Sequence, residues 1–374
     1  MVRARSMGMV SPNWVSTETG VRFDEAYFAD PAHRHAANRV VSAWLVAFNA
    51  DLRRRVARYD VDFEPVGISG IGGVFDNRGV DVLTVGLPQV FVLVTATFGG
   101  KIVYFDQDNP DVEGYPLAGL ERAADLVVPD ISQAEPVRTY LRQYDELVEL
   151  HGRSEVELFA GVDATTGMAQ WYLHSPLTTA YRLRGEQIFL DMADDPEMAS
   201  AVLDAALTTC RSLFDTYEAR IGVPIRRLPL ATCIASLVSP ALYRAWEVPR
   251  IRQLAERYGE VRIHSCGISS HILEALADVP GIVEMEVGAG TDIARTRALF
   301  PDATINYLID TPKFVHYTSR TAFEEVCDAL RASGDGPFVA LWPSETGTPL
   351  EAIEGVYAAV SEHNQSARRA AGRS

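Results

Sequence analysis

The chain has 374 residues, of which 47% are hydrophobic and 22% charged, so it can bury a large core and is not disordered throughout. Its net charge of -16 would repel the phosphates of nucleic acid and the surface of an anionic membrane, so neither is an expected partner. The length suits one α/β barrel or two smaller domains.

The N-terminus, MVRARSMGMVSPNW, lacks the apolar core of a signal peptide. We predict a flexible segment over residues 1–20, a single domain over 21–364 and a polar tail over 365–374. The apolar run that begins at Val90 is too short to cross a bilayer. Four scattered cysteines without a secretion signal predict a cytoplasmic protein with reduced thiols.

Residues 23–59 have a helical pattern, and a glycine-rich stretch follows at 67–79. Beyond residue 150, short β-branched runs alternate with amphipathic helices, which predicts parallel strands joined by crossover helices. At least six such strands favour an α/β fold of the (β/α)8 TIM-type barrel class, with an N-terminal helical extension. A dinucleotide-binding fold is disfavoured because no G-x-G-x-x-G opens a helix directly after a strand. The predicted strands are 156–163, 228–236, 261–267, 282–287, 303–310 and 337–344.

The stretch VRIHSCG places His264 and Cys266 two residues apart at the end of a strand, so their side chains share one face. In a parallel barrel the carboxyl ends of the strands carry the active site. An imidazole and a thiolate there form half of a zinc site that needs one or two more ligands. The alternative is a buried cysteine beside a hydrogen-bonded histidine.

Neighbouring strand ends supply further candidates. Glu284 and Glu286 alternate with apolar residues in IVEMEV, and carboxylates on such a strand must be solvated, paired or metal-bound. Cys233 and Glu345 are candidate metal ligands, although an inert buried thiol and a solvated loop residue are the alternatives. The remaining candidates are the general acid or base residues Asp163 and Glu286, the carboxylate-binding residues Arg78 and Arg184, and the aromatic pocket walls Trp171, Tyr172 and Tyr307.

Four segments together resemble the uroporphyrinogen decarboxylase superfamily, and they are closer to its zinc-dependent corrinoid:thiol methyltransferase-like members than to the decarboxylase itself. The resemblance implies a (β/α)8 barrel in which the H-x-C pair holds Zn²⁺ together with a later cysteine. It also implies that a corrinoid, carried by a corrinoid protein, is the methyl donor. The segments are 175–207, 236–256, 263–279 with the motif IHSCGISSHILEALADV, and GTPLEAI at 347–353.

The chain departs from this pattern in two places. The later cysteine would fall in WPSETG at 342–347, which has none, so Ser344, Glu345, Cys233 or Glu286 would have to replace it. The arginine-rich motif with which the decarboxylases hold their substrate is also missing, and Arg78 stands alone in that neighbourhood.

Three functions remain open at this point. The first is a zinc-assisted methyl- or alkyltransferase that acts on a small thiol or a corrinoid-linked methyl group. The second is a metal-independent decarboxylase or lyase of a small carboxylic acid, and the third is a non-catalytic binding module on an enzyme barrel. We expect a small-molecule substrate and a monomer or homodimer.

Overall fold

The computed structural model describes residues 3–69, 83–85, 90–151, 156–158 and 173–371. Within them, an eight-stranded parallel sheet has the strand order β2-β1-β12-β11-β10-β9-β8-β7. Its strands are β1 (Arg5–Val10), β2 (Gly67–Ile68), β7 (Leu173–His174), β8 (Arg227–Ala231), β9 (Glu260–Ser265), β10 (Ile282–Gly288), β11 (Thr304–Leu308) and β12 (Phe338–Ser344). Two small sheets pair β3 (Leu83–Val85) with β6 (Val156–Leu158) and β4 (Lys101–Phe105) with β5 (Asp108–Glu113).

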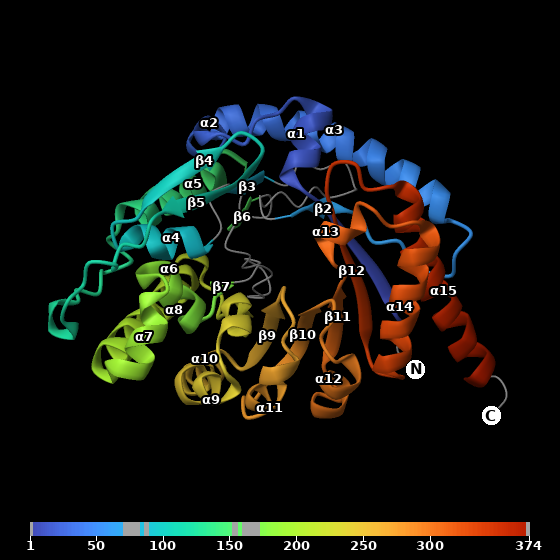
Figure 1. Cartoon of the computed structure of the whole chain (residues 1–374). Helices are drawn as coiled ribbons and strands as arrows, with labels where there is room; N and C mark the ends of the chain where they lie inside the picture. Colours follow the sequence, from blue (N-terminus) through green and yellow to red (C-terminus); the bar gives the residue numbers. More distant parts are fainter. Residues whose placement is uncertain (1–2, 70–82, 86–89, 152–155, 159–172, 372–374) are drawn as a thin grey trace.

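The large sheet curls around an interior, and helices cover its outer side (Figure 1). This arrangement confirms the predicted (β/α)8 barrel. The helices are α1 (Pro12–Thr19), α2 (Glu25–Ala29), α3 (Pro31–Val56), α4 (Val90–Thr97), α5 (Glu135–His151), α6 (Pro176–Arg184), α7 (Gln187–Asp194), α8 (Pro196–Ile221), α9 (Pro240–Leu242), α10 (Val248–Tyr258), α11 (Leu273–Leu276), α12 (Ile293–Leu299), α13 (Thr311–Phe314), α14 (Ser319–Ser333) and α15 (Leu350–Ala371). Shorter helical turns are η1 (Ala123–Asp125), η3 (Cys233–Leu237), η4 (Tyr243–Glu247) and η5 (Ser270–Ile272).

Local sequence explains where several helices begin. The side chains of Ser175 and Asp195 accept hydrogen bonds from backbone N–H groups in the first turns of α6 and α8, and proline follows each of them. Proline suits the first helical position because its missing N–H would have no partner there. The Ser175 cap directly follows the last residue of β7 and fixes where the chain leaves that strand, and the Asp195 cap fixes the turn between α7 and α8.

The N-terminal segment corrects our prediction of a flexible stretch over residues 1–20. Residues 5–10 form β1, which lies between β2 and β12, and residues 12–19 form α1. The six residues RSMGMV have no pronounced apolar pattern of their own, so their order depends on pairing with a strand more than 300 residues away. At the other end, α15 continues to Ala371, past the predicted domain boundary at 364.

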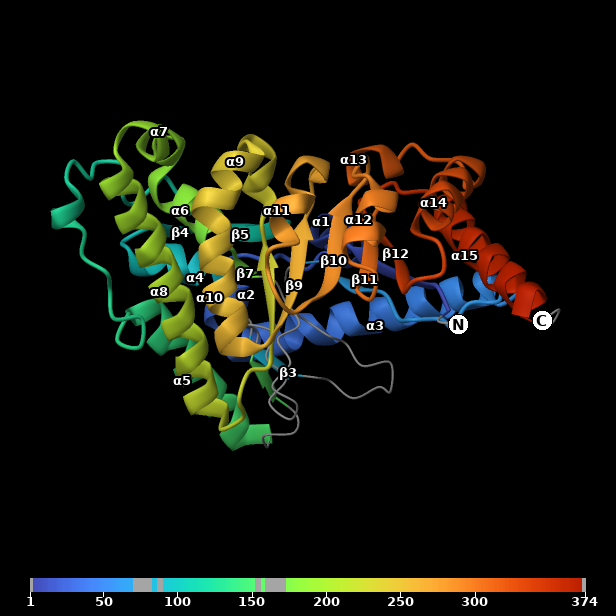
Figure 2. The same ribbon diagram turned by 90° about the horizontal axis from the view of Figure 1, so that it is seen from below.

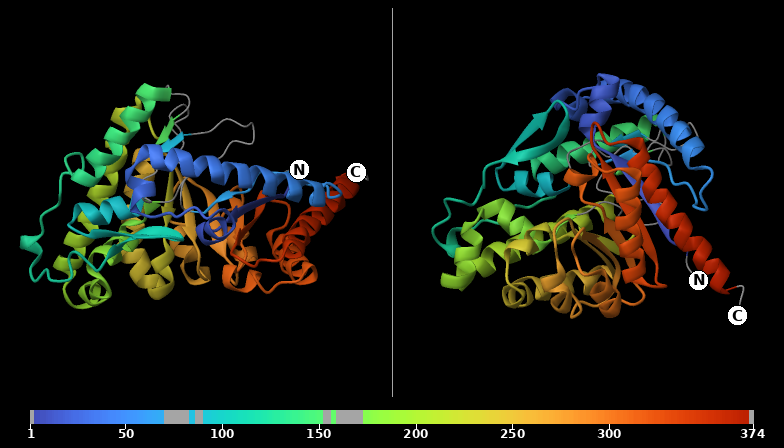
Figure 3. Two further views of the ribbon diagram at one scale, coloured as in Figure 1. Left: turned by 90° about the horizontal axis from the view of Figure 1, so that it is seen from above. Right: turned by 45° about the vertical axis from the view of Figure 1, so that its right-hand side comes forward.

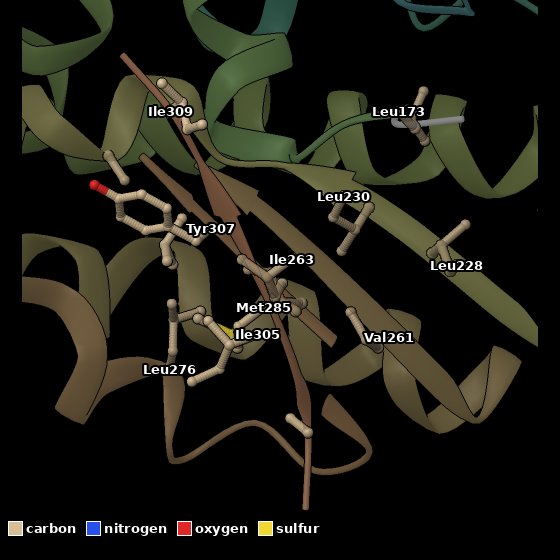
Figure 4. Close-up of a cluster of buried hydrophobic side chains, with 14 of the residues drawn as sticks. Leu173, Leu228, Leu230, Val261, Ile263, Leu276, Met285, Ile305, Tyr307 and Ile309 are labelled. Carbon is tan, nitrogen blue, oxygen red and sulfur yellow. The ribbon is translucent and has the colours of Figure 1, made fainter. Parts of the chain in front are cut away.

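The apolar core packs between the sheet and its outer helices. Ile263, Met285 and Ile305 are register partners on β9, β10 and β11, and all three are buried on the helix side of the sheet, where Leu276 of α11 meets them (Figure 4). Because side chains alternate along a strand, His264 and Glu286 face the barrel interior. This alternation positions the site described below.

The views in Figures 2 and 3 show α10, α11 and α12 following one another outside β9 to β11, with the N- and C-terminal ends of the chain on the same side of the molecule. The backbone N–H of Ala4 donates to Asn364 of α15 at 3.0 Å. Among the described residues, no helix combines the length and apolar character that a membrane crossing requires.

Candidate metal centre

Three side chains that carry metal-ligating atoms converge at the carboxyl ends of two neighbouring strands. Cys233 begins η3 directly beyond β8, while His264 and Cys266 lie at the end of β9 and just beyond it. One ligand atom from each residue lies within 4.8 Å of the others. The predicted H-x-C pair is thus joined by the cysteine of the preceding strand.

Backbone contacts hold the two cysteine-bearing segments together. The N–H of Thr232 donates to the carbonyl of His264 at 2.7 Å, which continues the pairing of β8 and β9 past the last residue of β8. His271 of η5 contacts the carbonyl of Ala235 in η3 through its Nε2 atom at 3.1 Å. The loop after β9 therefore braces the turn that carries Cys233.

Gly288 allows β10 to approach the same place closely. A methyl group on its Cα would overlap the carbonyl oxygen of Cys266. At Gly267, by contrast, the nearest atom to such a methyl group would be Ser236 Cβ at 3.6 Å, an ordinary contact. The position of Cys266 thus depends on a missing side chain in the neighbouring strand.

Glu286 is not isolated in the barrel interior, because it pairs with His264. Its Oε1 atom lies 2.5 Å from His264 Nδ1, and the side chain is only 7% exposed. Burial lowers the pKa of His264, but the Glu286 carboxylate and hydrogen bonds with both thiols outweigh it and raise the pKa well above its usual value. The contact at Nδ1 leaves Nε2 as the ring nitrogen available to a metal held together with Cys233 and Cys266.

A hydrogen bond links the two thiols of the centre. A hydrogen bond donated by Cys266 lowers the pKa of Cys233, with a further contribution from His264 that burial opposes. The same bond raises the pKa of Cys266.

The chemistry of these donors fits Zn²⁺. Two thiolates and one imidazole, with one coordination position left over, form a catalytic rather than a closed structural zinc set. Tetrahedral zinc ligands lie roughly 3.3–3.8 Å apart, so the group has to contract by about 1 Å, within the reach of side-chain rotation. A carboxylate behind the ligating histidine is the usual means of fixing the ring and its tautomer. Cys266 is exposed, which leaves the group open to a substrate.

Several predicted site residues do not join this group. Glu345, our other candidate ligand, is not a member of the metal-ligating set found among the described residues, and its N–H donates to Thr348 Oγ1 at 3.0 Å. The prediction that Tyr307 lines a pocket is wrong. Its side chain faces the outer helices, where the hydroxyl donates to Glu325 of α14 at 2.9 Å. Four further candidates, Arg78, Asp163, Trp171 and Tyr172, lie outside the described residues.

The remaining charged candidates have other partners. Glu284 accepts hydrogen bonds from Arg262 at 2.5 Å and from Asn306 at 2.6 Å, so it belongs to a polar network inside the barrel. Arg184 is 6% exposed, pairs with Asp191 and donates to the carbonyl of Leu117. Arg184 therefore holds α6, α7 and the loop at Leu117 together and takes no part in the centre.

Sequence reasoning missed His174, the last residue of β7. His174 and His264 are both register partners of Ala231, so all three face the barrel interior in one row. Burial lowers the pKa of His174 to about 4, and the charges of Cys233 and His264 also act on it. His174 could have been identified from the sequence, because it directly precedes Ser175, the N-cap of α6, and so ends the strand before that helix.

Fold and site together define a (β/α)8-barrel protein with a cysteine–histidine–cysteine group at the carboxyl ends of its strands. In structure, the chain is similar to a methyltransferase from Methanosarcina mazei, with a TM-score of 0.60 and 16% identity over 96% of this chain and 94% of that chain. The expected resemblance is thereby confirmed in its fold.

A B12-independent methionine synthase from Shewanella sp. W3-18-1 is a more distant match, with a TM-score of 0.35 and 15% identity over 55% of this chain and 63% of that chain. No protein-family model matches the chain, and no curated protein matches its sequence.

Proposed function

We propose that this protein is a zinc-dependent methyl- or alkyltransferase that transfers its group to a small thiol, with a corrinoid-linked methyl group as the donor. The observation that carries this proposal is the convergence of Cys233, His264 and Cys266, with Glu286 behind the histidine. Such a donor set with an open position suits activation of an incoming ligand. The structural neighbour from Methanosarcina mazei is a methyltransferase, and the resemblance of the H-x-C motif supports the same chemistry.

Each residue of the centre has a definite task in this proposal. Cys233, His264 and Cys266 would hold the metal, and Glu286 would keep the imidazole in the tautomer whose Nε2 faces it. Bound Zn²⁺ would supply the Lewis acidity that lets a thiol lose its proton near neutral pH. The exposed side of Cys266 gives the thiol and the methyl donor a way in.

The lyase alternative has less support among the described residues. It needs a carboxylate available as general acid or base and a cation that clamps the substrate. Glu286 is paired with His264, Glu284 with Arg262, and Arg184 with Asp191. A non-catalytic binding module does not require two thiols and a histidine that is supported by a buried carboxylate.

Metal content tests the proposal first. The purified protein should contain about one zinc per chain, and His264→Ala, Cys266→Ala and Cys233→Ser should each lose it. Cys327→Ser is the matched control, because Cys327 lies on α14 outside the sheet, and it should keep its zinc. Protein that neither holds zinc nor takes it up would overturn the proposal.

Activity tests it second. With methylcobalamin as donor and 2-mercaptoethanol as acceptor, the zinc-loaded protein should accelerate demethylation of the corrinoid, followed by its absorbance. The three ligand variants should fall to the uncatalysed rate, and Cys327→Ser should not. If the zinc-loaded protein is inactive with every corrinoid and thiol offered, the metal site stands but the proposed transferase reaction is overturned.

A further inference from the structure

The two cysteines of the centre lie at matching positions just beyond the ends of two neighbouring strands. Ala231 of β8 is the register partner of His264 of β9, and each cysteine lies two residues further along its own chain segment. The Thr232-to-His264 hydrogen bond carries the pairing into this region. Cys233 and Cys266 are therefore close in space, and their sulfur atoms lie within 4.8 Å of each other.

The short separation of the two sulfur atoms favours a disulfide. A disulfide needs its sulfur atoms about 2.05 Å apart, and these two, as free thiols, already lie within 4.8 Å of each other. The other two cysteines lack such a partner position: Cys210 is buried in α8, where its thiol lies 3.9 Å from the carbonyl oxygen of His174, and Cys327 lies on α14.

We propose that Cys233 and Cys266 form a reversible disulfide that excludes the metal, so that thiol redox state controls this site. The control rests on the proposed function, because the same two sulfurs are the metal ligands there. A protein kept in a reducing compartment forms such a bond only transiently, as sensing disulfides do.

The reaction needs an oxidant, and a low-molecular-weight disulfide supplies it. Cys266, the exposed thiol, loses its proton and attacks one sulfur of the small disulfide as the thiolate, which forms a mixed disulfide and releases one small thiol. Cys233 then attacks the Cys266 sulfur, forms the internal bond and releases the second small thiol. The two cysteine protons end on the two small thiols, so atoms and electrons balance.

The oxidised state cannot serve as the zinc site. Zinc binds thiolates, and both are consumed in the internal bond. Only His264, held by Glu286, would remain of the three ligands, and a single imidazole does not retain the metal against a chelator. Metal occupancy and the disulfide are thus mutually exclusive.

The test uses the full chain stripped of metal by a chelator and exposed to oxidised glutathione. Intact mass under non-reducing conditions should fall by two hydrogen atoms, the number of titratable thiols should fall from four to two, and peptide mapping should link Cys233 to Cys266. Cys327→Ser should form the same link. Cys233→Ser should stop at a glutathione adduct on Cys266.

A second arm measures zinc. Reduced protein should bind about one zinc per chain, oxidised protein close to none, and dithiothreitol should restore binding. If the reduced protein binds zinc but the Cys233–Cys266 disulfide does not form, the redox control alone is overturned. Zinc binding by the oxidised protein would overturn it as well. Absence of zinc binding by the reduced protein overturns the proposed function, and the control with it.

Discussion

At the scale of single residues, Glu286 has the most specific task in the proposed centre. Its carboxylate holds His264 through Nδ1, so Glu286→Gln keeps a hydrogen-bond acceptor but loses the charge. We expect zinc affinity to fall about 10- to 100-fold, measured by competition with a chromogenic chelator. Glu345→Gln, outside the group, should leave affinity unchanged. Equal affinities in all three proteins would show that Glu286 does not support the histidine.

Glu247 is a buried carboxyl group that gives stability a pH dependence. Its Oε2 accepts from the N–H of Leu177 at 2.9 Å, and burial, opposed by hydrogen bonds with Ser175 and Leu177, raises its pKa from 4.5 to about 7. A raised carboxyl pKa favours the folded state only while the group is protonated. Stability is therefore lost as the pH rises from about 4.5, and the loss is complete above about 7.

Glu247→Gln removes this titration. The variant should gain up to about 3 kcal/mol over the parent at pH 8 and little at pH 5, because one pKa unit corresponds to about 1.4 kcal/mol. Urea unfolding of both proteins at the two pH values measures the difference. A gap that does not change with pH would mean that Glu247 stays ionised in the folded protein.

At the scale of elements, the contact between β10 and the end of β9 is the one that an added methyl group would disturb most directly. Gly288→Ala should displace the Cys266 carbonyl and weaken zinc binding at least tenfold, while the secondary structure, measured by circular dichroism, stays the same. Gly267→Ala is the matched control, since it adds the same methyl group beside Cys266 but brings it only into an ordinary contact with Ser236. If both variants bind zinc alike, the close approach of β10 has no role in the centre.

The sequence predicted the strand–helix alternation beyond residue 150 well, because capped helices and β-branched runs are local signals. It failed for β1, whose order comes from pairing with β12. It failed also for Tyr307, because both faces of a barrel strand are buried and an amphipathic side chain suits either one. Only the alternation with inward-facing Asn306 decides which face Tyr307 takes.

At the scale of the molecule, the centre joins two strands, β8 and β9. The pair His264 and Cys266 could be predicted because spacing within one strand fixes a shared face. Cys233 could be named only as one of several alternatives, since choosing among them requires the order and register of the sheet. Predicting His174 requires the same information, because this residue lies on β7, which pairs with β8.

Because the ligands bridge two strands, metal should stabilise the folded chain as a whole. At free zinc about 100 times the dissociation constant, linkage adds about 2.7 kcal/mol and raises the unfolding temperature. Thermal scans of the reduced protein with and without zinc measure the effect. Cys233→Ser should show no rise, and a rise equal to that of the parent would place the metal elsewhere.

The position of β1 also bears on how the chain is made. Among the described strands, β1 is made before all the others, and it pairs, from Arg5 with Val339 to Val10 with Ser344, with β12, which is made after them. During synthesis one edge of β1 must stay open until residues 338–344 have emerged, and closing so long a loop is slow. A circular permutant that joins the two neighbouring ends would turn this distant pairing into a local one and should fold faster than the natural chain.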